Sequence, residues 1–571
     1  MYLHKAKRSD GRIYLSIVQS YRGSNGKNRN KTIESLGYVD ELEEKYDDPI
    51  AHFQSVVCKM RVERQDQTAP VSLIVNPQKR LTFKVTRKNL GFVALSCIYH
   101  KLSLACFFTR AGAKTKSEFN LNQVVKLLVY ERILNPGSKR AAYKAKDSYF
   151  EKFDFSEADL YRALGEIAKT SDKLQSYLHK QVSEKYSRDT SLLYYDVTNY
   201  HFESDTTDDL RVKGFSKNGK RDPIVQMGLL IDSLGLPLSF DLFAGNTNDC
   251  KTYLPVISKA KRDYNIGKVI VVADKGIKSS DNCAYNLIKG DGYIFSASIR
   301  GSKVDKDIKE WVLDSSGYKW EGKDESRAIK TRITHRNLHL EGVDGKKKPI
   351  AVKEKHVAMW SKKYARRAIK KRAEAIAKAQ ELIKNKGAYT RSISYGGAKY
   401  VKGLNIDKKT GEILKSAKVL TLDIEKIEKE AKYDGFYLIV TSEINMVSKD
   451  IVRAYSGLAK IEESFKVTKS YLKTRPVFVW TKEHIKAHFL ICFLSLLIIR
   501  ILELKTEGKH SIVSMIDALK SASATNIESN WWTFDYRSEA LDDIGKACNI
   551  DFSRQFMQLK DIRKIVAKSK K

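Results

Sequence analysis

Cysteine is scarce in this chain and follows no ligand pattern. The sequence has seven cysteines, none in a CxxC pair and none at zinc-finger spacing to histidines. This pattern disfavours a zinc module and fits a reducing, cytoplasmic compartment. His488 and Cys492 are four residues apart, but they lie in an apolar stretch. We therefore expect them to be core residues and not metal ligands.

Long hydrophobic segments are also missing. The N-terminus from Met1 to Arg8 has no apolar stretch of the signal-peptide kind. The most apolar run, Ala487 to Ile499, is interrupted by Arg500 and is shorter than the roughly 20 residues that a membrane helix needs. We expect no membrane segment, and we interpret the run as a buried helix against a sheet.

Positive charge is what the chain has in excess. Lys plus Arg number 104 against 68 Asp plus Glu, which gives a net charge of +36 that is spread over the whole length. A soluble basic surface would explain this, but phosphate binding by counterion release is the sharper interpretation. The 571 residues, 42% of them hydrophobic, suffice for about two to four domains. We expect a nucleic-acid partner.

The first 88 residues have the pattern of a small basic module. Residues 10–35 alternate around a turn at 24–27, which predicts a β-hairpin, and a helix is expected at 47–64. The candidate DNA contacts of the hairpin are Arg22, Lys27 and Arg29. We predict that 1–88 binds DNA, and a merely solvated hairpin is the alternative.

A helical domain is predicted at 89–189. Asn122 to Leu134 has apolar positions at helical spacing, and Asn135 to Gly137 ends that helix. Lys139 and Arg140 follow in the loop and are candidate DNA contacts. The domain is expected to serve DNA binding or dimerisation, and an all-helical scaffold is the alternative.

From residue 190 the pattern changes to strands. The segments alternate as three strands, helix, strand, helix and strand. Their ranges are 191–202, 223–232, 236–243, 252–264, 268–274, 279–289 and 292–298. This order predicts an α/β fold with an RNase H-like core, whose first part is 190–300. In that fold one acid lies on the first strand and another on the strand after the first helix, and Asp196 and Asp274 occupy these places.

Residues 301–434 interrupt this core. Glycines near 390–425 indicate β-turns, which predicts a β-rich insertion, and 361–386 has the pattern of a basic amphipathic helix. The second part of the core is expected at 435–505, with a buried strand and a helix that carries Glu462. Residues 506–571 are predicted to form a C-terminal helical region, a candidate for dimerisation.

Asp196, Asp274 and Glu462 are candidate ligands of one metal site. Phosphodiester cleavage needs an activated nucleophile and a stabilised leaving oxygen, which two Mg²⁺ ions about 4 Å apart provide. Mg²⁺ prefers hard oxygen ligands, and Mn²⁺ is a suitable substitute. Asp196 would bridge both ions, and we expect the three carboxylates within about 8 Å of one another. Glu463 stands beside Glu462, so the sequence leaves open which of the two glutamates is the third ligand.

Tyr455 and Lys469 are predicted to lie on the same helix as the glutamate. Glu462 and Lys469 are seven residues apart, which places them on one stripe two turns long. A lysine there can reach a DNA phosphate next to the metals. A plain helical surface is the alternative for all three residues.

The motif Tyr455-x2-Leu458-x3-Glu462-x6-Lys469, with the two aspartates, resembles the Asp-Asp-Glu transposases of bacterial insertion sequences. The similar group is the IS-four type, to which the Tn-five transposase is related. Its signature has arginine where this chain has Leu458. Lys460 and Arg453 are candidates to replace that arginine. The resemblance covers about 190–505.

The resemblance implies cut-and-paste transposition in a bacterial cytoplasm. The protein would bind terminal inverted repeats, pair two ends as a homodimer, cut, and join 3′ hydroxyls to target DNA. In relatives a tryptophan of the insertion stacks on a flipped base, and Trp311, Trp320 and Trp360 are the candidates here. The alternatives are a stand-alone metal-dependent nuclease and a catalytically decayed DNA-binding regulator.

Overall fold

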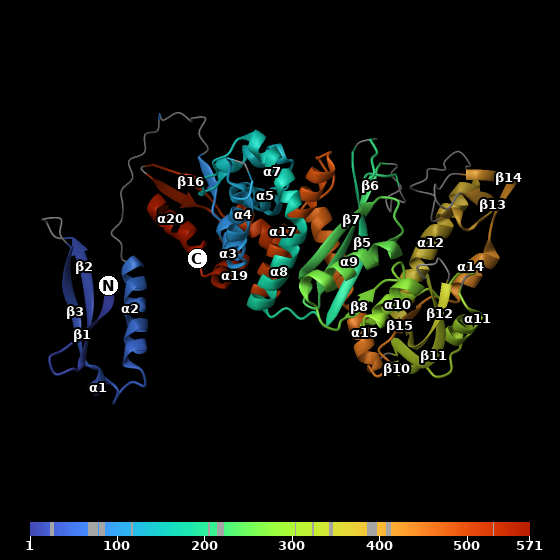
Figure 1. Ribbon diagram of the computed structural model, residues 1–571, viewed down its shortest axis with the longest axis horizontal. Coiled ribbons are helices and arrows are strands. Elements are labelled where there is room, and N and C mark those ends of the chain that lie inside the picture. The colour runs from blue at the N-terminus through green and yellow to red at the C-terminus, as the bar shows by residue number, and fades with distance from the viewer. Residues whose placement is uncertain are drawn as a thin grey trace. The chain divides into compact units, whose positions relative to one another are not determined.

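The computed structural model separates into two compact units, Met1–Leu81 and Thr82–Lys571, and each is described by itself (Figure 1). It describes residues 1–22, 28–66, 78, 86–115, 118–203, 206–213, 222–302, 304–321, 325–341, 347–384, 397–406, 413–528 and 530–571.

The first unit is a three-stranded antiparallel sheet with two helices. β1 (Tyr2–Lys7), β2 (Ile13–Arg22) and β3 (Asn28–Tyr38) pair in that order, followed by α1 (Val39–Leu42) and α2 (Pro49–Asp66). The predicted hairpin and helix are present. β1 was not predicted, because its sequence YLHKAK is too polar to stand out as a strand. The hairpin turn lies outside the described residues.

The second unit contains a nine-stranded mixed sheet in the order β10-β11-β12-β15-β9-β8-β5-β6-β7. β5 (Leu192–His201), β8 (Ile270–Ala273) and β9 (Gly292–Ala297) are parallel neighbours, and β6 (Ile224–Asp232) and β7 (Pro237–Ala244) continue the sheet antiparallel. Two helices connect the strands from β7 to β9, as parallel pairing requires. These are α9 (Asp249–Tyr264) and α10 (Ser280–Ile288). The element order predicted for 191–298 is therefore present.

The segment expected as an insertion supplies three further strands to this sheet. β10 (Lys319–Glu321), β11 (Arg327–Glu341) and β12 (Lys347–Ser361) pair antiparallel, and β12 joins β9 through β15 (Phe436–Thr441). The remaining elements are α11 (Lys306–Leu313), α12 (Lys362–Lys384), the paired strands β13 (Val401–Ile406) and β14 (Ile413–Leu422), and α14 (Ile424–Ala431). The amphipathic helix predicted at 361–386 is α12.

A helical part packs beside the β7 side of the sheet. Its N-terminal helices are α3 (Phe92–Lys101), α4 (Leu104–Gly112), α5 (Leu121–Leu134), α6 (Lys139–Lys144), α7 (Glu157–Lys169) and α8 (Ser171–Tyr186). C-terminal elements complete it: α17 (Lys482–Lys505), α18 (Ile512–Ser521), α19 (Glu539–Cys548) and α20 (Leu559–Lys568). α17 contacts α3, α5 and α7 as well as β7.

A small sheet ties the two ends of this helical part together. Its strands are β4 (Arg87–Asn89), β16 (Ser523–Asn526), β17 (Trp531–Phe534) and β18 (Phe556–Gln558), and β16 pairs with β4. The regions predicted at 89–189 and 506–571 therefore share one core.

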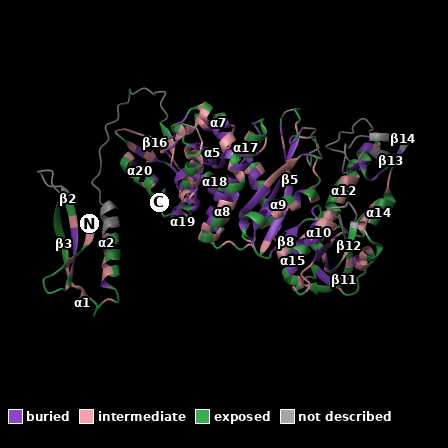
Figure 2. Ribbon diagram, viewed as in Figure 1, coloured by how far each residue is buried: buried purple, intermediate pink, exposed green. Residues whose placement is uncertain are grey.

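α17 is a long apolar helix. It is long and apolar enough to cross a membrane, but 94% of its most apolar window is buried inside the protein, as the purple helix in Figure 2 shows. The predicted buried helix is thus confirmed, although its neighbours are mainly helices. The sequence predicted this helix at 484–503, and it does continue past Arg500, which is buried against Glu463 and Glu503.

Candidate active site

Strand alternation places Asp196 and Asp274 on one face of the sheet. In β5, Leu193, Tyr195 and Val197 enter one core, while Tyr194 enters the other, so Asp196 lies on the Tyr194 face. Tyr195 pairs with Ala273 in parallel register, so Asp196 and Asp274 follow at adjacent positions. Neighbouring strands are about 4.8 Å apart, which makes the two aspartates direct neighbours.

Glu462 approaches the same face from α16 (Ala459–Lys466). Ile461 and Phe465 anchor α16 in the core that contains Tyr194. Glu462 lines a cleft together with both aspartates. The sequence analysis expected these three acids, which are far apart in the chain, at one site.

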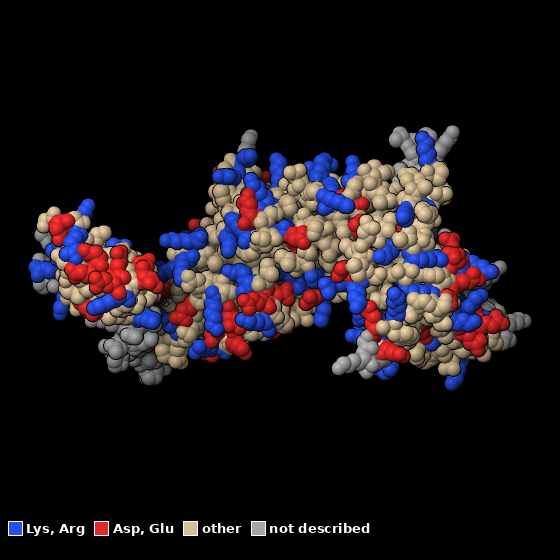
Figure 3. Space-filling view, turned by 90° about the horizontal axis from the view of Figure 1, so that it is seen from below, with Lys and Arg blue, Asp and Glu red and all other residues tan. Residues whose placement is uncertain are grey.

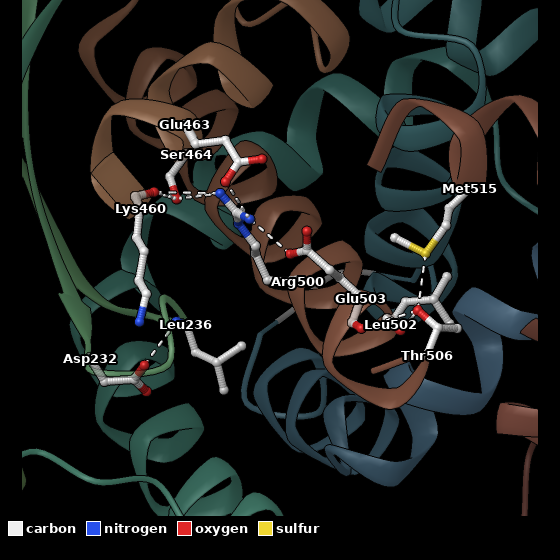
Figure 4. Close-up of polar contacts among 10 residues, drawn as sticks. All are labelled: Asp232, Leu236, Lys460, Glu463, Ser464, Arg500, Leu502, Glu503, Thr506 and Met515. Carbon is white, nitrogen blue, oxygen red and sulfur yellow. Dashed lines mark hydrogen bonds and ion pairs between the residues drawn. The ribbon is translucent and has the colours of Figure 1, made fainter. Parts of the chain in front are cut away.

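Glu463 has a different environment. Its carboxylate pairs with Arg500 of α17 at 3.4 Å, and Arg500 also pairs with Glu503 at 2.8 Å and donates to Ser464 at 3.1 Å (Figure 4). Glu463 does not line the cleft. Of the two neighbouring glutamates, Glu462 is therefore the one placed with the aspartates.

The cleft has a volume of about 1310 Å³. Its walls come from β5, β9, β15, α12, α15 (Ser448–Ser456) and α16. Within the described part of the chain, no group of three His, Cys, Asp or Glu residues is close enough to hold a metal ion. The three carboxylates thus line one cleft without forming a closed set of ligands.

Hydrogen bonds hold the two aspartates. The Asp196 carboxylate accepts from the Val197 N–H at 2.7 Å. Asp274 accepts from the Ser296 hydroxyl at 2.6 Å and from the Tyr455 hydroxyl at 3.4 Å. Burial, and then the Asp274 carboxylate, raise the pKa of Tyr455 above its usual range. Tyr455 is therefore a hydrogen-bond donor to Asp274 at neutral pH.

Lys469 also lines the cleft, but not on a continuous α-helix. It lies in the π-helical turn η3 (Val467–Tyr471) that follows α16. Its ammonium donates to the Thr198 hydroxyl and lies 5.5 Å from the Tyr200 ring centroid. The predicted two-turn stripe is replaced by a π-turn, a feature common at functional sites.

Leu458 fills the position where similar transposases have arginine. It is buried and contributes to the cleft wall. Lys460 donates to the Ser233 carbonyl, and Arg453 is exposed with a 3.7 Å contact to Asp450. Neither lines the cleft, so neither replaces the arginine as suggested.

The other predicted DNA contacts lie in different surroundings. Arg29 is exposed on β3, whereas Lys27 and the side chain of Arg22 lie outside the described residues. Arg140 is exposed and contacts Glu157 at 3.3 Å. The prediction for Lys139 is wrong, because this residue is only 3% exposed and cannot reach a phosphate at the surface.

The three candidate tryptophans differ in exposure. Trp311 is half-buried beneath Arg332, whose guanidinium lies 4.4 Å from its ring centroid. Trp360 is half-buried and packs edge-on against Trp320, which is 52% exposed. None of the three lines the cleft. Trp320 is the one whose ring is open to solvent.

The sequence interpretation missed a row of cations in the cleft wall. Lys363, Arg367 and Lys371 of α12 line the cleft with the acids. Their four-residue spacing was visible within the amphipathic helix, but only the fold brings α12 to the acids. Elsewhere, Lys and Arg are spread over the visible surface with Asp and Glu between them (Figure 3).

Two known families match the sequence. The family described as Transposase DDE domain matches residues 189–498. The family described as IS1634 family transposase, N-terminal domain, matches residues 3–71. No curated protein matches.

Proposed function

Because the chain belongs to the family of transposases with a DDE domain, we propose that it cuts and joins DNA at the ends of an insertion sequence, with Asp196, Asp274 and Glu462 as its catalytic acids. The observation that carries this proposal is the single cleft that all three side chains line. The acids come from two neighbouring strands and one helix. They are the three predicted from the sequence.

The sheet order supports an RNase H-like core. β7, β6, β5, β8 and β9 are neighbours in that order, and α9 and α10 make the crossovers. In chain order, Asp196 lies on β5, the first of these strands, and Asp274 directly follows β8, the fourth. The relationship to the IS-four type and the Tn-five transposase belongs to this proposal. It is supported by the spacing of Tyr455, Glu462 and Lys469.

The donor set fits divalent cations. All three groups are carboxylates, the hard oxygen ligands that Mg²⁺ and Mn²⁺ prefer. Mg²⁺ keeps several waters and often takes only one or two protein carboxylates, so the neighbouring Asp196 and Asp274 would hold an ion and Glu462 would add a third carboxylate. Bound there, two ions would activate the nucleophile and stabilise the leaving oxygen.

The surrounding residues position these acids and the DNA. Ser296 and Tyr455 donate to the same oxygen of Asp274, which leaves its other oxygen open to a ligand. Lys469 is held between Thr198 and Tyr200 at the cleft wall. Its positive charge would fix a phosphate beside the acids without reading a base.

Recognition of the terminal inverted repeats is assigned to the N-terminal unit. That unit matches the N-terminal domain of IS1634 family transposases, and Arg29 and Lys31 are exposed on β3. Pairing of two ends requires two copies of the protein. A homodimer therefore belongs to the same proposal.

Neighbouring glutamates give a matched test of the catalytic assignment. Cleavage of DNA that carries the repeats flanking the gene should require Mg²⁺ or Mn²⁺ and should be abolished by Glu462→Gln. Glu463→Gln should retain it, since Glu463 faces Arg500. Both variants should bind the DNA, because phosphate contacts elsewhere supply the affinity. Full cleavage by Glu462→Gln, or loss only in Glu463→Gln, would remove Glu462 from the site.

A further inference from the structure

One wall of the cleft carries positive charges that the catalytic acids do not explain. Lys363, Arg367 and Lys371 of α12 line the cleft. α12 runs beside β12 and the β13–β14 pair (Figure 1). Residues four apart lie on one face of a helix, about 6 Å apart along its axis. The three side chains therefore form one row, named here the cleft row.

Among the residues that the structure describes, no acid pairs with the cleft row. Its neighbour Arg372 pairs with Asp434 at 2.5 Å. The side chains of Lys363, Arg367 and Lys371 are exposed, and they form no hydrogen bond or ion pair with any residue that the structure describes. Like charges four residues apart repel each other. Such a row is stabilised when an extended anion binds along it.

We propose that the cleft row is a phosphate-binding wall that holds the backbone of the DNA strand against the acids. This inference rests on the proposed function, because it assigns how the same cleft admits DNA. A phosphodiester backbone carries one charge per nucleotide and suits a row of regularly spaced cations. Tyr364 lies in the same wall, is 51% exposed and packs against Tyr437. Its ring can stack on a base of that strand.

α12 offers a matched control on its own surface. Lys362, Arg366 and Lys370 form a second row with the same spacing, types of charge and exposure, but none of them lines the cleft. This set is named the outer row. Alanine at all three positions of either row removes the same charge and favours the helix equally. The two triple variants therefore differ only in whether the removed charges line the cleft.

The test measures binding of the full-length protein to a labelled DNA duplex, without metal, over a range of salt concentrations. Lys363→Ala/Arg367→Ala/Lys371→Ala should make the negative slope of log affinity against log salt shallower by about 2.7, the value for three phosphate contacts. Lys362→Ala/Arg366→Ala/Lys370→Ala should leave the slope within about one contact of the wild-type value. In the cleavage assay, only the cleft-row variant should slow, by about tenfold or more.

The outcomes separate this inference from the proposed function. Equal changes in both triple variants, or none in the cleft-row variant, overturn the phosphate wall even if the wild-type protein cleaves. A slope change confined to the cleft-row variant supports the wall. If the wild-type protein then cleaves no repeat DNA with either metal, the wall stands and the proposed function fails.

Discussion

Lys139 shows how residue type and location can disagree. It follows a helix stop and has an arginine beside it, so the sequence suggests a surface contact for DNA. In the structure Ser138 caps α6, and Lys139 is directed into the core, where its ammonium lies 3.3 Å from His488 Nδ1. Burial, and then the charge of Arg132, lower the pKa of Lys139 to about 7. No pattern in the local sequence predicts that Lys139 is buried.

The shifted pKa gives a dependence of stability on pH. In the unfolded chain a lysine titrates near pH 10.4, so between about pH 7 and 10 the unfolded state binds one more proton than the folded state. The contribution of Lys139 to the free energy of unfolding must therefore rise with pH in this window. Below pH 7 both states are protonated and the contribution is constant.

We predict that Lys139→Met removes this dependence. The free energy of unfolding of the wild-type protein, relative to the variant, should rise by about 1.4 kcal/mol per pH unit from pH 7.5 to 9, as measured by denaturant titration. Arg140→Met is the control and should show no such trend, because Arg140 is exposed. A difference between wild type and Lys139→Met that is flat over this range would contradict a neutral buried Lys139.

At the scale of elements, the segment from Tyr455 to Lys469 is the instructive one. The sequence suggested a single helix, but the chain forms α15, a turn at Gly457, α16 and a π-turn. Gly457 allows this turn to pack closely on β5, because a Cβ there would lie 1.9 Å from the Tyr194 hydroxyl. Close packing of this turn on β5 sets the position of Glu462.

Gly457→Ala should therefore impair the site through packing. Tyr194 is buried, so the new methyl group has to displace either its ring or α16. We expect cleavage of repeat DNA to fall by about 100-fold and the free energy of unfolding to fall by about 1–3 kcal/mol. Gly267→Ala is the control, since its added Cβ meets nothing within 4 Å. Wild-type cleavage by Gly457→Ala would show that α16 tolerates the displacement.

For the molecule as a whole, local patterns predicted the elements better than their partners. The sequence predicted the places of the two aspartates on β5 and after β8. Strand faces and strand ends depend on local sequence, namely the alternation in both strands and the turn after Ala273. The pairing of β16 with β4 carries no such signal, since the paired residues Ser523 and Asn89 are far apart in the sequence. The packing of α5 and α7 on α17 was missed for the same reason.

These long-range contacts change where the chain can be divided. A cut at residue 188, before the strands begin, would remove α5 and α7 from α17. The C-terminal residues are also held in that core: Ser569 donates to Ser96 at 3.1 Å, and Lys570 pairs with Glu151 at 2.7 Å. The boundary that the structure supports is the one after Leu81.

We predict opposite results for two truncations. Residues 82–571 should unfold cooperatively near the melting temperature of that unit in the full chain, and should lose preference for repeat DNA over unrelated DNA. Residues 1–505 should lose cooperative unfolding and solubility, because α17, α3 and β4 lose partners that bury apolar surface.

Thermal melts and gel-shift competition would check both fragments. Should 1–505 instead melt as a folded protein and lose only self-association, residues 506–571 would be the dimerisation region suggested by the sequence. Should 82–571 keep its repeat preference, recognition would lie outside the N-terminal unit.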